Sequence, residues 1–542
     1  MICGKSAVFV CLLGAVGAAL VQAQSGTATI TGSVTDPSGA AIHRAAVSAR
    51  NPETGDVRST ITNETGNYNL PGLRPAAYDV TVESPGFRRY SQREFRVEVD
   101  QVARLDVQLE LGQVAEQVEV RGTAQLLHTE NATVGSVIET RKIVELPLNG
   151  RNFVQLSLLV PGVNTGQPGA GRGGGVSIGG ARSEQNAFQL DGVSNTDQYD
   201  SGIAFRPNVD VIQEFKIEVN NYSAEFGKGA GGQINVVTKS GTNQFHGSAW
   251  EFHRNNAVQA RNFFDNNPAF VTSGGRFKAP PFIQNQFGAL ASGPVIRNKT
   301  FFLGSYEGFR RVRGATGRRS VPTAAMRQGD FSAQLGAPVG TDALGRAVFA
   351  NQIFDARTSR MVPGSNRYVR DPFPGNRIFA DRIDPIAAKL LQMGLWPLPN
   401  VAGTRDARTG DPRQNYLDGR PNRNLTNQYL ARVDHRFTDN DTLYGRFGYN
   451  ESDDKGPGNF PGNERISTNT QAVIAASYTK AISATKVNEL RFGWTRESPF
   501  SGATRIQQGR NLVRELGIRG LPLAGPGAPS VGIAGLTSFS DP

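Results

Sequence analysis

The stretch that decides the fold is residues 428–450, QYLARVDHRFTDNDTLYGRFGYN. On both sides of the short link Thr438–Asp441, apolar and polar residues alternate. Before the link the apolar positions are Tyr429, Ala431, Val433 and Phe437, and the polar positions are Gln428, Arg432, Asp434 and Arg436. After it, Leu443, Phe447 and Tyr449 alternate with Thr442, Arg446 and Asn450. Successive side chains of a strand point to opposite faces, so this stretch predicts an antiparallel hairpin with one apolar and one charged face.

A later stretch repeats the pattern, since Leu490, Phe492 and Trp494 alternate with Glu489, Arg491 and Thr495. An apolar outer face and a charged inner face are what a barrel embedded in lipid requires. A soluble sandwich with its apolar face inward gives the same alternation, and the charges alone do not separate the two. The rest of the chain favours the barrel, and we expect an all-β fold.

Composition agrees with many strands joined by turns, because the 542 residues include 63 Gly and 30 Pro. Charged residues at 19% and hydrophobic residues at 38% argue against a wholly disordered chain. The net charge is +11, from 58 basic and 47 acidic residues. Arginines are scattered and form no block, so a basic lumen or a surface facing anionic lipid fits, and we expect no nucleic-acid partner.

Residues 1–23 have the pattern of a signal peptide. Lys5 supplies a positive start, Ala7–Leu20 an apolar stretch, and Val21–Ala23 a cleavage site before Gln24. The alternative is a membrane anchor, but the apolar stretch is short of the ~20 residues that a span needs. Cys3 and Cys11 are the only two cysteines, so the mature chain has no thiol chemistry. No later segment holds ~20 consecutive apolar residues, and a membrane role must come from strands.

Residues 24–112 predict a β-sandwich, with about seven short alternating strands separated by turns such as Asp36–Gly39 and Asn63–Gly66. The segments Gly32–Gly39, Thr65–Tyr68, Tyr78–Val82 and Pro85–Phe87, with Ile42 and Val47, resemble the carboxypeptidase-regulatory-like domain. That resemblance implies a prealbumin-like or carbohydrate-binding-like fold and an accessory role, without peptidase activity. Tyr68, Tyr78 and Phe87 could stack on a sugar, but a core position is favoured for each.

Residues 143–240 carry several motifs in a fixed order. They are Glu145–Phe153, Leu158–Val163, Ile178–Arg182, Gln189–Val193, Ile212–Ile217, Ala224–Gly229 and Gly231–Lys239. Together they resemble the plug domain of TonB-dependent outer-membrane receptors of the Oar-like subgroup. Two departures are Phe226 where a Tyr is usual and Asn220–Asn221 where an Arg-Gly pair is usual. The plug-motif residues that we single out are Arg182, Asp191, Gly192, Gly231, Gly232 and Asn235.

Residues 113–142 are predicted to be a linker. In receptors of this kind a short extended segment before the plug pairs strand to strand with the periplasmic energy-coupling protein. The candidate for this TonB box is Val118, Glu119, Val120, Arg121 and Gly122. A last strand of the sandwich and a plain linker are equally good interpretations of the same residues.

Residues 241–542 are expected to form the first part of an outer-membrane β-barrel. Residues 257–282 and 320–419 lack alternation and are predicted to be extracellular loops, with a helical patch at Ile383–Met393. About seven strands alternate convincingly, whereas barrels of outer-membrane transporters have about 22. The last residues, Ser538–Pro542, are no terminal aromatic strand. We therefore expect an incomplete barrel from a fragment or a truncated gene.

No residue pattern predicts catalysis with any force. Gly175–Gly179 fits the G-x-S-x-G elbow around Ser177, but that elbow needs a strand before it and a helix after it. His246 and His253 are seven positions apart, which places them on opposite faces of a strand. They are therefore not expected to bind the same metal ion. We expect no enzyme, no cofactor and no metal site.

The sequence thus predicts a plug-gated receptor or transporter in the outer membrane of a Gram-negative bacterium, with the N-terminal domain in the periplasm. Its partners would be a TonB-type energy-coupling protein and outer-membrane lipid. The ligand would be large, and a carbohydrate, a siderophore and a peptide all stay open. The alternative from another functional class is an adhesion or protein-export factor on the same scaffold.

Overall fold

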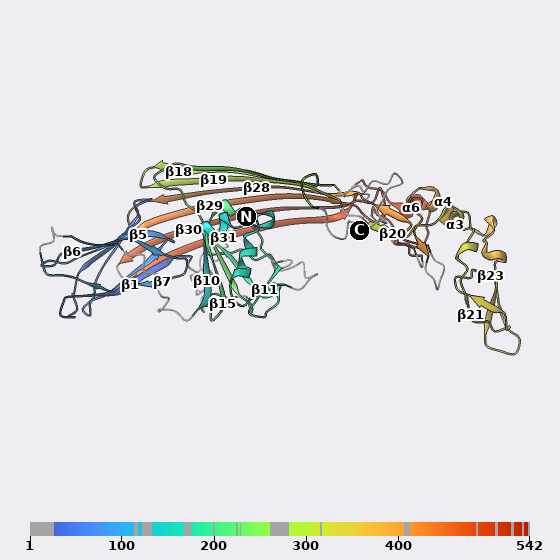
Figure 1. The fold of residues 1–542 in the computed structure, drawn as a ribbon, viewed down its shortest axis with the longest axis horizontal. Helices are drawn as coiled ribbons and strands as arrows, with labels where there is room; N and C mark the ends of the chain where they lie inside the picture. Colours follow the sequence, from blue (N-terminus) through green and yellow to red (C-terminus); the bar gives the residue numbers. More distant parts are fainter. Residues whose placement is uncertain are drawn as a thin grey trace, which may run out of the picture.

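The structure is a computed structural model, and its architecture is shown in Figure 1. It describes residues 26–112, 117–121, 133–166, 175–198, 201–223, 226–227, 229–260, 281–314, 317–405, 412–483, 486–504, 508–521, 525–533 and 536–539. The predicted signal peptide lies outside these residues. Three bodies follow one another along the chain: a small sandwich, a mixed body over residues 134–238 and a sheet of long strands. The second body is here called the plug, after the domain that the sequence predicts there.

The sandwich consists of two sheets. Its strands are β1 (Ala28–Thr35), β2 (Ala46–Arg50), β3 (Val57–Ile61), β4 (Asn67–Leu73), β5 (Ala76–Glu83), β6 (Arg89–Val97), β7 (Val102–Arg104), β8 (Val107–Gln108) and β9 (Gln117–Arg121). One sheet has the order β4-β1-β7, with β8 also paired to β1, and the other has the order β3-β2-β5-β6-β9. Buried alternate residues such as Ile30, Val47 and Val80 fill the space between them. The predicted sandwich is therefore present, and β3 is a strand that the sequence analysis did not identify.

The plug is built on a five-stranded sheet with the order β10-β15-β16-β13-β14. Its elements are β10 (Val134–Glu139), α2 (Thr140–Glu145), η2 (Asn149–Arg151), η3 (Phe153–Leu159), β11 (Val163–Thr165), β12 (Val176–Ile178), η5 (Ser183–Gln185), β13 (Ala187–Leu190), β14 (Val193–Ser194), η6 (Val209–Val211), β15 (Ile212–Asn220) and β16 (Gln233–Thr238). The edge strand β10 lies in the segment that was predicted to be linker. The plug therefore has ordered structure before residue 143.

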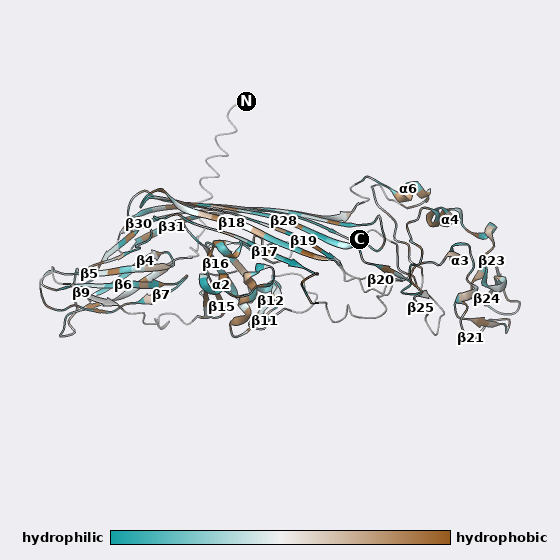
Figure 2. Ribbon diagram, turned by 45° about the horizontal axis from the view of Figure 1, so that its top comes forward, coloured by the Kyte–Doolittle hydropathy of each residue, from teal (hydrophilic) through white to brown (hydrophobic). Residues whose placement is uncertain are grey.

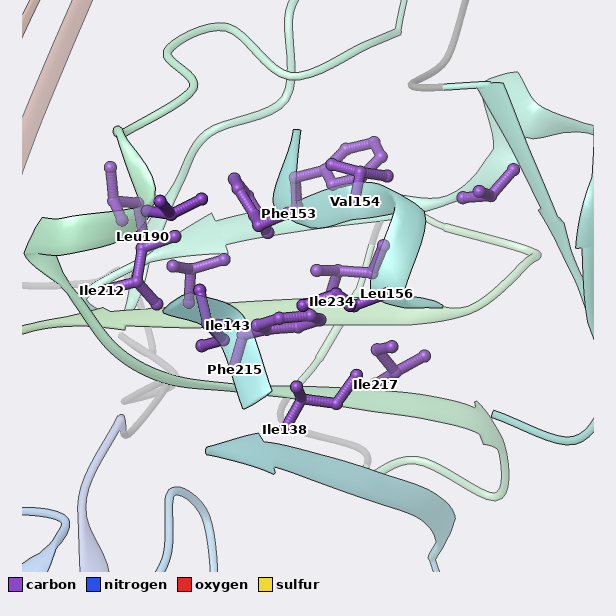
Figure 3. Packing of buried hydrophobic residues seen from close by; sticks show 14 of the residues in the cluster. Ile138, Ile143, Phe153, Val154, Leu156, Leu190, Ile212, Phe215, Ile217 and Ile234 are labelled. Carbon is purple, nitrogen blue, oxygen red and sulfur yellow. The ribbon is translucent and has the colours of Figure 1, made fainter. Parts of the chain in front are cut away.

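A dense apolar core holds the plug together. In Figure 3, Phe153 of η3 and Ile143 of α2 face Phe215 of β15 and Ile234 of β16. The rings of Phe153 and Phe215 meet edge to face, with their centroids 5.3 Å apart. The short helical segments therefore cover one face of the plug sheet.

The long strands form one antiparallel sheet, here called the wall. Its strands are β17 (His246–Asn255), β18 (Phe282–Ile296), β19 (Thr300–Gly314), β28 (Pro421–Arg436), β29 (Asp441–Gly456), β30 (Arg465–Ser483) and β31 (Lys486–Ala503). They follow this order in a seven-stranded sheet. β28 and β29 are joined by the predicted link, so the hairpin of residues 428–450 is confirmed. Hydrophobic and hydrophilic residues alternate along the wall strands in Figure 2.

The two faces of the wall have opposite environments. On the outer face, Tyr429, Val433 and Phe447 are exposed, as are Leu490, Phe492 and Trp494. On the inner face, Arg432, Asp434 and Arg446 are buried. A soluble sandwich buries its apolar face, whereas this sheet buries its charged face against the plug (Figure 1). The arrangement decides between the two interpretations in favour of the barrel.

Smaller elements gather at the end of the wall opposite the sandwich (Figure 1). They are β20 (Gly317–Arg319), α3 (Ala324–Arg327), η9 (Ser332–Gln334), β21 (Pro338–Thr341), β22 (Ala347–Phe349), β23 (Phe354–Met361), β24 (Tyr368–Pro372), η10 (Pro374–Asn376), η11 (Ala380–Arg382), α4 (Pro385–Gln392), β25 (Thr404–Arg405), β26 (Pro412–Arg413), β27 (Tyr416–Asp418) and α6 (Leu512–Leu516). The predicted helical patch corresponds to α4. In the part of the chain that the structure describes, no helix is both long and apolar enough to cross a membrane.

These loops share a hydrophobic core of their own. It joins three separate segments: the connection between β19 and β28 through Trp396, the connection between β29 and β30 through Phe460, and the segment after β31 through Phe539. All three side chains are almost completely buried. The Trp396 indole N–H also donates to the carbonyl of Thr537. The segment 320–419, predicted to be an extracellular loop with a helical patch, therefore carries more secondary structure than expected and shares a core with other segments.

Candidate functional site

The turn Asp191–Gly192 places a carboxylate at the surface of the plug that faces the wall. Leu190 of β13 pairs with Val193 of β14, so the two residues form a tight hairpin turn. Their φ angles are 52° and 71°, both in the left-handed region that a type I′ turn needs. Asp followed by Gly is the sequence that tolerates this backbone best. The motif that the sequence analysis singled out thus makes a rigid support for one side chain.

The Asp191 carboxylate is held between two arginines of the wall. Arg446 donates to it at 2.6 Å and Arg432 at 3.2 Å. The plug itself contributes the backbone N–H of Thr238, at 2.8 Å. All three charged side chains are at most 4% exposed. A buried carboxylate with two charge-assisted partners is a strong contact, and it lies where the plug meets the wall.

Asp434 completes the charge balance of this contact. It accepts two hydrogen bonds from Arg432, each 3.0 Å long, and one from Ser240 at 2.9 Å. We call Asp191, Arg432, Asp434 and Arg446 the plug–wall cluster. Its two carboxylates match its two guanidinium groups, so no net charge is left buried within it.

Two further polar contacts surround the turn. The Tyr444 hydroxyl donates to the carbonyl of Asp191 at 2.7 Å, and the Arg432 guanidinium lies 4.6 Å from the centre of the Tyr444 ring. Arg491 of β31 donates to the carbonyl of Gly192. The turn is therefore held by three strands of the wall, the adjacent strands β28 and β29 and the strand β31 beyond β30.

A second anchor joins the plug to the opposite edge of the wall, at β17 and β19. The guanidinium carbon of Arg151, in η2, lies 4.9 Å from the ring centre of Trp250 and 4.8 Å from that of Phe252, both on β17. The guanidinium pairs with Asp210 inside the plug and lies 3.7 Å from Glu307 of β19. The planar guanidinium group can stack on both rings and face both carboxylates at once. A Lys side chain cannot stack in this way, so its substitution for Arg would weaken the contact.

Glycines of the wall allow the plug to approach closely. A Cβ at Gly493 of β31 would lie 2.1 Å from Cγ1 of Val193, and a Cβ at Gly448 of β29 would lie 2.8 Å from the Phe205 ring. Only glycine fits where another chain segment packs directly on a strand. These positions show that wall and plug are complementary in shape as well as in charge.

The other predicted plug-motif residues lie away from the plug–wall cluster. Arg182 is exposed at the start of η5. Gly231 and Gly232 pack inside the plug, where a Cβ would collide with Asn186 and Ile178 respectively. Asn235 of β16 donates to the Asp100 carboxylate of the sandwich. The structure thus brings Asp191 and Gly192 together at the wall and assigns the rest to the plug interior and the sandwich contact.

The TonB-box candidate lies at the edge of the sandwich. Residues 117–121 form β9, which pairs in parallel with β6, and β9 is the last strand of its sheet. Gly122 lies outside the described residues. The segment is therefore extended, as strand addition requires, and it has the position of a last sandwich strand.

The aromatic residues of the sandwich are structural. Tyr68 and Tyr78 are buried, and their hydroxyls donate to the carbonyls of Leu105 and Arg74. Burial raises the pKa of both hydroxyls well above the usual value. Phe87 packs against the same core. The favoured interpretation, core over sugar contact, fits these positions.

The weak catalytic patterns gain no support. Ser177 lies on β12 and donates to the carbonyl of Ala181, and the turn η5 follows where an elbow would have an α-helix. His246 hydrogen-bonds with Thr242, and His253 with Asn285. Among the residues that the structure describes, no three His, Cys, Asp or Glu side chains gather as a metal site would need.

Arg432, Arg446 and Arg151 were not singled out as site residues by the sequence analysis, and neither was Asp434. The first two stand on the charged face of the predicted hairpin, so their direction was foreseeable. Their partner was not, because Arg432 and Asp191 are separated by 241 positions in the sequence. Arg151 lies in the Leu-Asn-Gly-Arg-Asn motif, but no sequence pattern near it indicates that its side chain stacks on β17.

A long-stranded wall with an apolar outer face and a charged inner face defines part of an outer-membrane β-barrel. The chain belongs to the family described as outer membrane beta barrel domain, whose model matches residues 237–542. A carboxypeptidase regulatory-like domain matches residues 29–110. These matches confirm the expected N-terminal domain and barrel and a location in the outer membrane of Gram-negative bacteria.

Among known proteins, the chain is 27% identical over 274 residues to the TonB-dependent transporter Oar of Myxococcus xanthus. The match covers 48% of this chain and 24% of that relative, so the chain spans about a quarter of its length. With the two family matches, it confirms the expected relationship to TonB-dependent receptors of the Oar type.

Solved structures with a similar chain path include two outer-membrane proteins. The outer membrane transporter YddB from Escherichia coli matches with a TM-score of 0.43 and 15% identity, over 69% of this chain and 40% of its own. The siderophore receptor PirA from Pseudomonas aeruginosa matches with a TM-score of 0.30 and 12% identity, over 70% of this chain and 50% of its own. The relative in Myxococcus xanthus is named a transporter and the larger family match is a barrel domain, which fits the expectation of a protein that is not an enzyme.

Proposed function

We propose that the chain is part of an energised outer-membrane transporter in which the plug gates the barrel. The observation that carries the proposal is the Asp191 carboxylate of the plug, held between Arg432 and Arg446 of the wall. An ion pair between two bodies can break and re-form reversibly, whereas a covalent link between them cannot. The closed state is then the one in which the plug–wall cluster is intact.

Opening requires force or binding energy, because the cluster is buried. Removal of one member of a buried ion pair costs about 3–5 kcal/mol when its partner stays unpaired. Displacement of the plug would leave Arg432 and Arg446 with Asp434 as the one neighbouring carboxylate of the cluster. A ligand bound outside supplies the signal, and a TonB-type coupling protein that pairs with Val118–Gly122 supplies the pull.

The ligand is proposed to be large, as an energised and plugged barrel would be needless for small solutes. The folded loop body at the end of the wall opposite the sandwich offers a preformed surface for it. The relative in Myxococcus xanthus is named a transporter and PirA a siderophore receptor, but neither name assigns a ligand to this chain. Carbohydrate, siderophore and peptide therefore stay as candidates.

The gating proposal is tested by ion conductance of the receptor in planar lipid bilayers with potassium chloride. Asp191→Asn removes the charge that the two arginines share, and we expect frequent openings where the parent protein is closed. Glu145→Gln is the matched control, because that plug carboxylate is 63% exposed and pairs only locally with Arg141. Equal conductance of Asp191→Asn and the control would contradict gating through this cluster.

The adhesion or export alternative is favoured by the same folded loop body, since a surface with its own core suits a macromolecular partner. The two functions differ in their need for the coupling protein. Deletion of residues 116–122 should abolish an energised transport function and leave adhesion of whole cells unchanged. Loss of both transport and adhesion in the deletion variant would favour neither function and would indicate that the barrel is misassembled. A shift of its gel mobility on heating, which only a folded barrel shows, checks assembly.

A further inference from the structure

The sandwich touches both of the bodies that must move relative to each other. In Figure 1 it lies at the end of the wall strands and beside the plug. The contacts are specific on both sides. Many come from the loops of the sandwich, and Arg58 of β3 and Arg96 of β6 add contacts from its strands. An accessory domain on a free tether would make neither set.

The contacts with the plug involve two adjacent residues of the sandwich, Val99 and Asp100. The Val99 backbone N–H donates to the Glu214 carboxylate of β15, which is 1% exposed. Lys216 on the same strand donates to the Asp100 carbonyl at 3.2 Å, and Asn235 of β16 donates to the Asp100 carboxylate. The two central strands of the plug sheet are thus attached to one loop of the sandwich.

The contacts with the wall come from two other loops and from β3, where Arg58 donates to the carbonyl of Asp439. Arg74 forms an ion pair with Asp434 at 2.7 Å. The carbonyls of Glu53 and Gly55 accept hydrogen bonds from Asn243 and Arg436, at 2.9 Å and 2.8 Å. These partners lie at the ends of the wall strands, next to their turns. The sandwich is therefore attached to the wall at several points independent of the plug.

Arg74 extends the plug–wall cluster into the sandwich. Asp434 receives Arg74 from the sandwich and Arg432 from its own strand, and Arg432 in turn reaches Asp191 of the plug. The charges run without a break from the sandwich through the wall to the plug. Loss of Arg74 would remove the ion pair that joins the sandwich to this network of charges.

We propose that the carboxypeptidase-regulatory-like sandwich is a latch: while it is docked on the wall it holds the plug in the closed position, and it must detach before the plug can move. This inference rests on the proposed gating function and adds a role for the N-terminal domain. The latch is closed by the loops at Gly55, Arg74 and Asp100. A cavity of about 470 Å³ at the junction, lined among others by Arg74, Lys239 and Tyr444, separates the bodies between these points.

The first test cross-links the latch. A Cβ at Gly55 would lie 3.6 Å from the Cβ of Asn298 in the turn between β18 and β19, within the range of about 3.5–4.5 Å that disulfides span. The double substitution Gly55→Cys with Asn298→Cys is made in the mature receptor, whose sequence after residue 11 contains no other cysteine. Asp191→Asn is added so that openings are frequent. We expect oxidation to suppress the openings several-fold and reduction to restore them.

The second test loosens the latch. Arg74→Ala should raise the opening frequency several-fold, and it should raise hydrogen exchange at the Val99 amide by a similar factor. Arg50→Ala is the control, because Arg50 is a solvent-facing arginine of the same sandwich. Exchange at Val99 reports docking directly, without any ligand.

The outcomes separate the latch from the gate. If the oxidised protein opens as often as the reduced one, the sandwich need not detach and the latch is refuted. The same holds if Arg74→Ala frees the Val99 amide and leaves the conductance unchanged. If Asp191→Asn itself gives no openings, the gating proposal fails, while Val99 exchange in Arg74→Ala still decides whether Arg74 holds the sandwich on the plug.

Discussion

Arg432 and Arg446 stand directly opposite each other on β28 and β29, and both guanidinium groups reach the single carboxylate of Asp191 in the plug. Like charges opposite each other on neighbouring strands repel, and both side chains are buried here. The two buried arginines of the wall therefore need a negative charge nearby, and Asp191 of the plug supplies it. The complementarity of the two bodies is the basis of the predictions below.

Shape complementarity is tested at Gly493. Gly493→Ala puts a methyl group against Val193, where a Cβ would lie 2.1 Å from Cγ1, and we expect the turn at Asp191 to be displaced at a cost of about 1–3 kcal/mol. Hydrogen exchange at β13 and β14 measures the displacement. Gly304→Ala on β19 is the control, because nothing lies within 4 Å of a Cβ there. Val193→Ala in the same chain should restore protection, and a failure to do so would show that Gly493 acts through the strand itself.

The second anchor predicts a difference between arginine and lysine. Arg151→Lys keeps the charge near Asp210 and Glu307 but loses the planar stacking on Trp250 and Phe252. The expected loss is about 1–2 kcal/mol, seen as a lower urea midpoint for plug release followed by tryptophan fluorescence. Arg141→Lys, at a position that is 83% exposed, should leave the midpoint unchanged.

Docking of the sandwich on the plug should depend on pH through Glu214. Burial raises the pKa of its carboxyl to about 7, opposed by the hydrogen bond from Val99 and by Arg96 and reinforced by Glu98 and Glu139. The docked state thus holds a proton that an exposed carboxyl releases near its ordinary value of 4.5. Docking is favoured below pH 4.5, weakens as the pH rises toward 7, and changes no further above it, with a total loss of at most about 3 kcal/mol.

Protection of the Val99 amide from hydrogen exchange, corrected for intrinsic rates, measures this dependence. Glu214→Gln keeps an acceptor for Val99 and removes the charge, so protection should become independent of pH and stay at its low-pH level. A pH dependence that persists in Glu214→Gln would assign the effect to another group.

The loop body should unfold as one unit when its core is opened. Trp396→Ala removes the largest of its fully buried side chains, at an expected cost of about 3–5 kcal/mol. Limited proteolysis of whole cells should then cut within all three segments of the loop body, which carry Trp396, Phe460 and Phe539 respectively. Phe379→Ala is the control, because that side chain is 53% exposed. Cleavage confined to the connection of Trp396 would mean that the loops fold separately.

The features that could be predicted from the sequence are those with a local cause. The alternation around Thr438–Asp441 fixed which side chains of β28 and β29 face outward, and Asp191–Gly192 is a turn because few other residue pairs adopt two positive φ angles. Motif order in residues 143–240 indicated the plug, although β10 and its sheet position were not visible in the segment predicted to be linker.

The remaining features depend on distant pairing. Nothing near Arg432 in the sequence specifies Asp191, and nothing near Arg74 specifies Asp434. The core of the loop body draws Trp396, Phe460 and Phe539 from three separate segments with no common period, so the sequence predicted residues 320–419 as an extracellular loop with one helical patch and did not show their shared core. Contacts of this kind follow from the topology of the wall, which a single sequence does not display.

The inside-out character of the wall has a consequence for biogenesis. Before insertion, β28–β31 would offer water a face with Leu490, Phe492 and Trp494, and would offer their own interior a row of charges that only another folded body can neutralise. Neither solvent nor lipid suits both faces at once. Because Arg432 and Arg446 find their shared carboxylate on Asp191, these strands reach their charge balance only when that turn is packed against them, so we expect the wall and the body behind it to reach their final structure together.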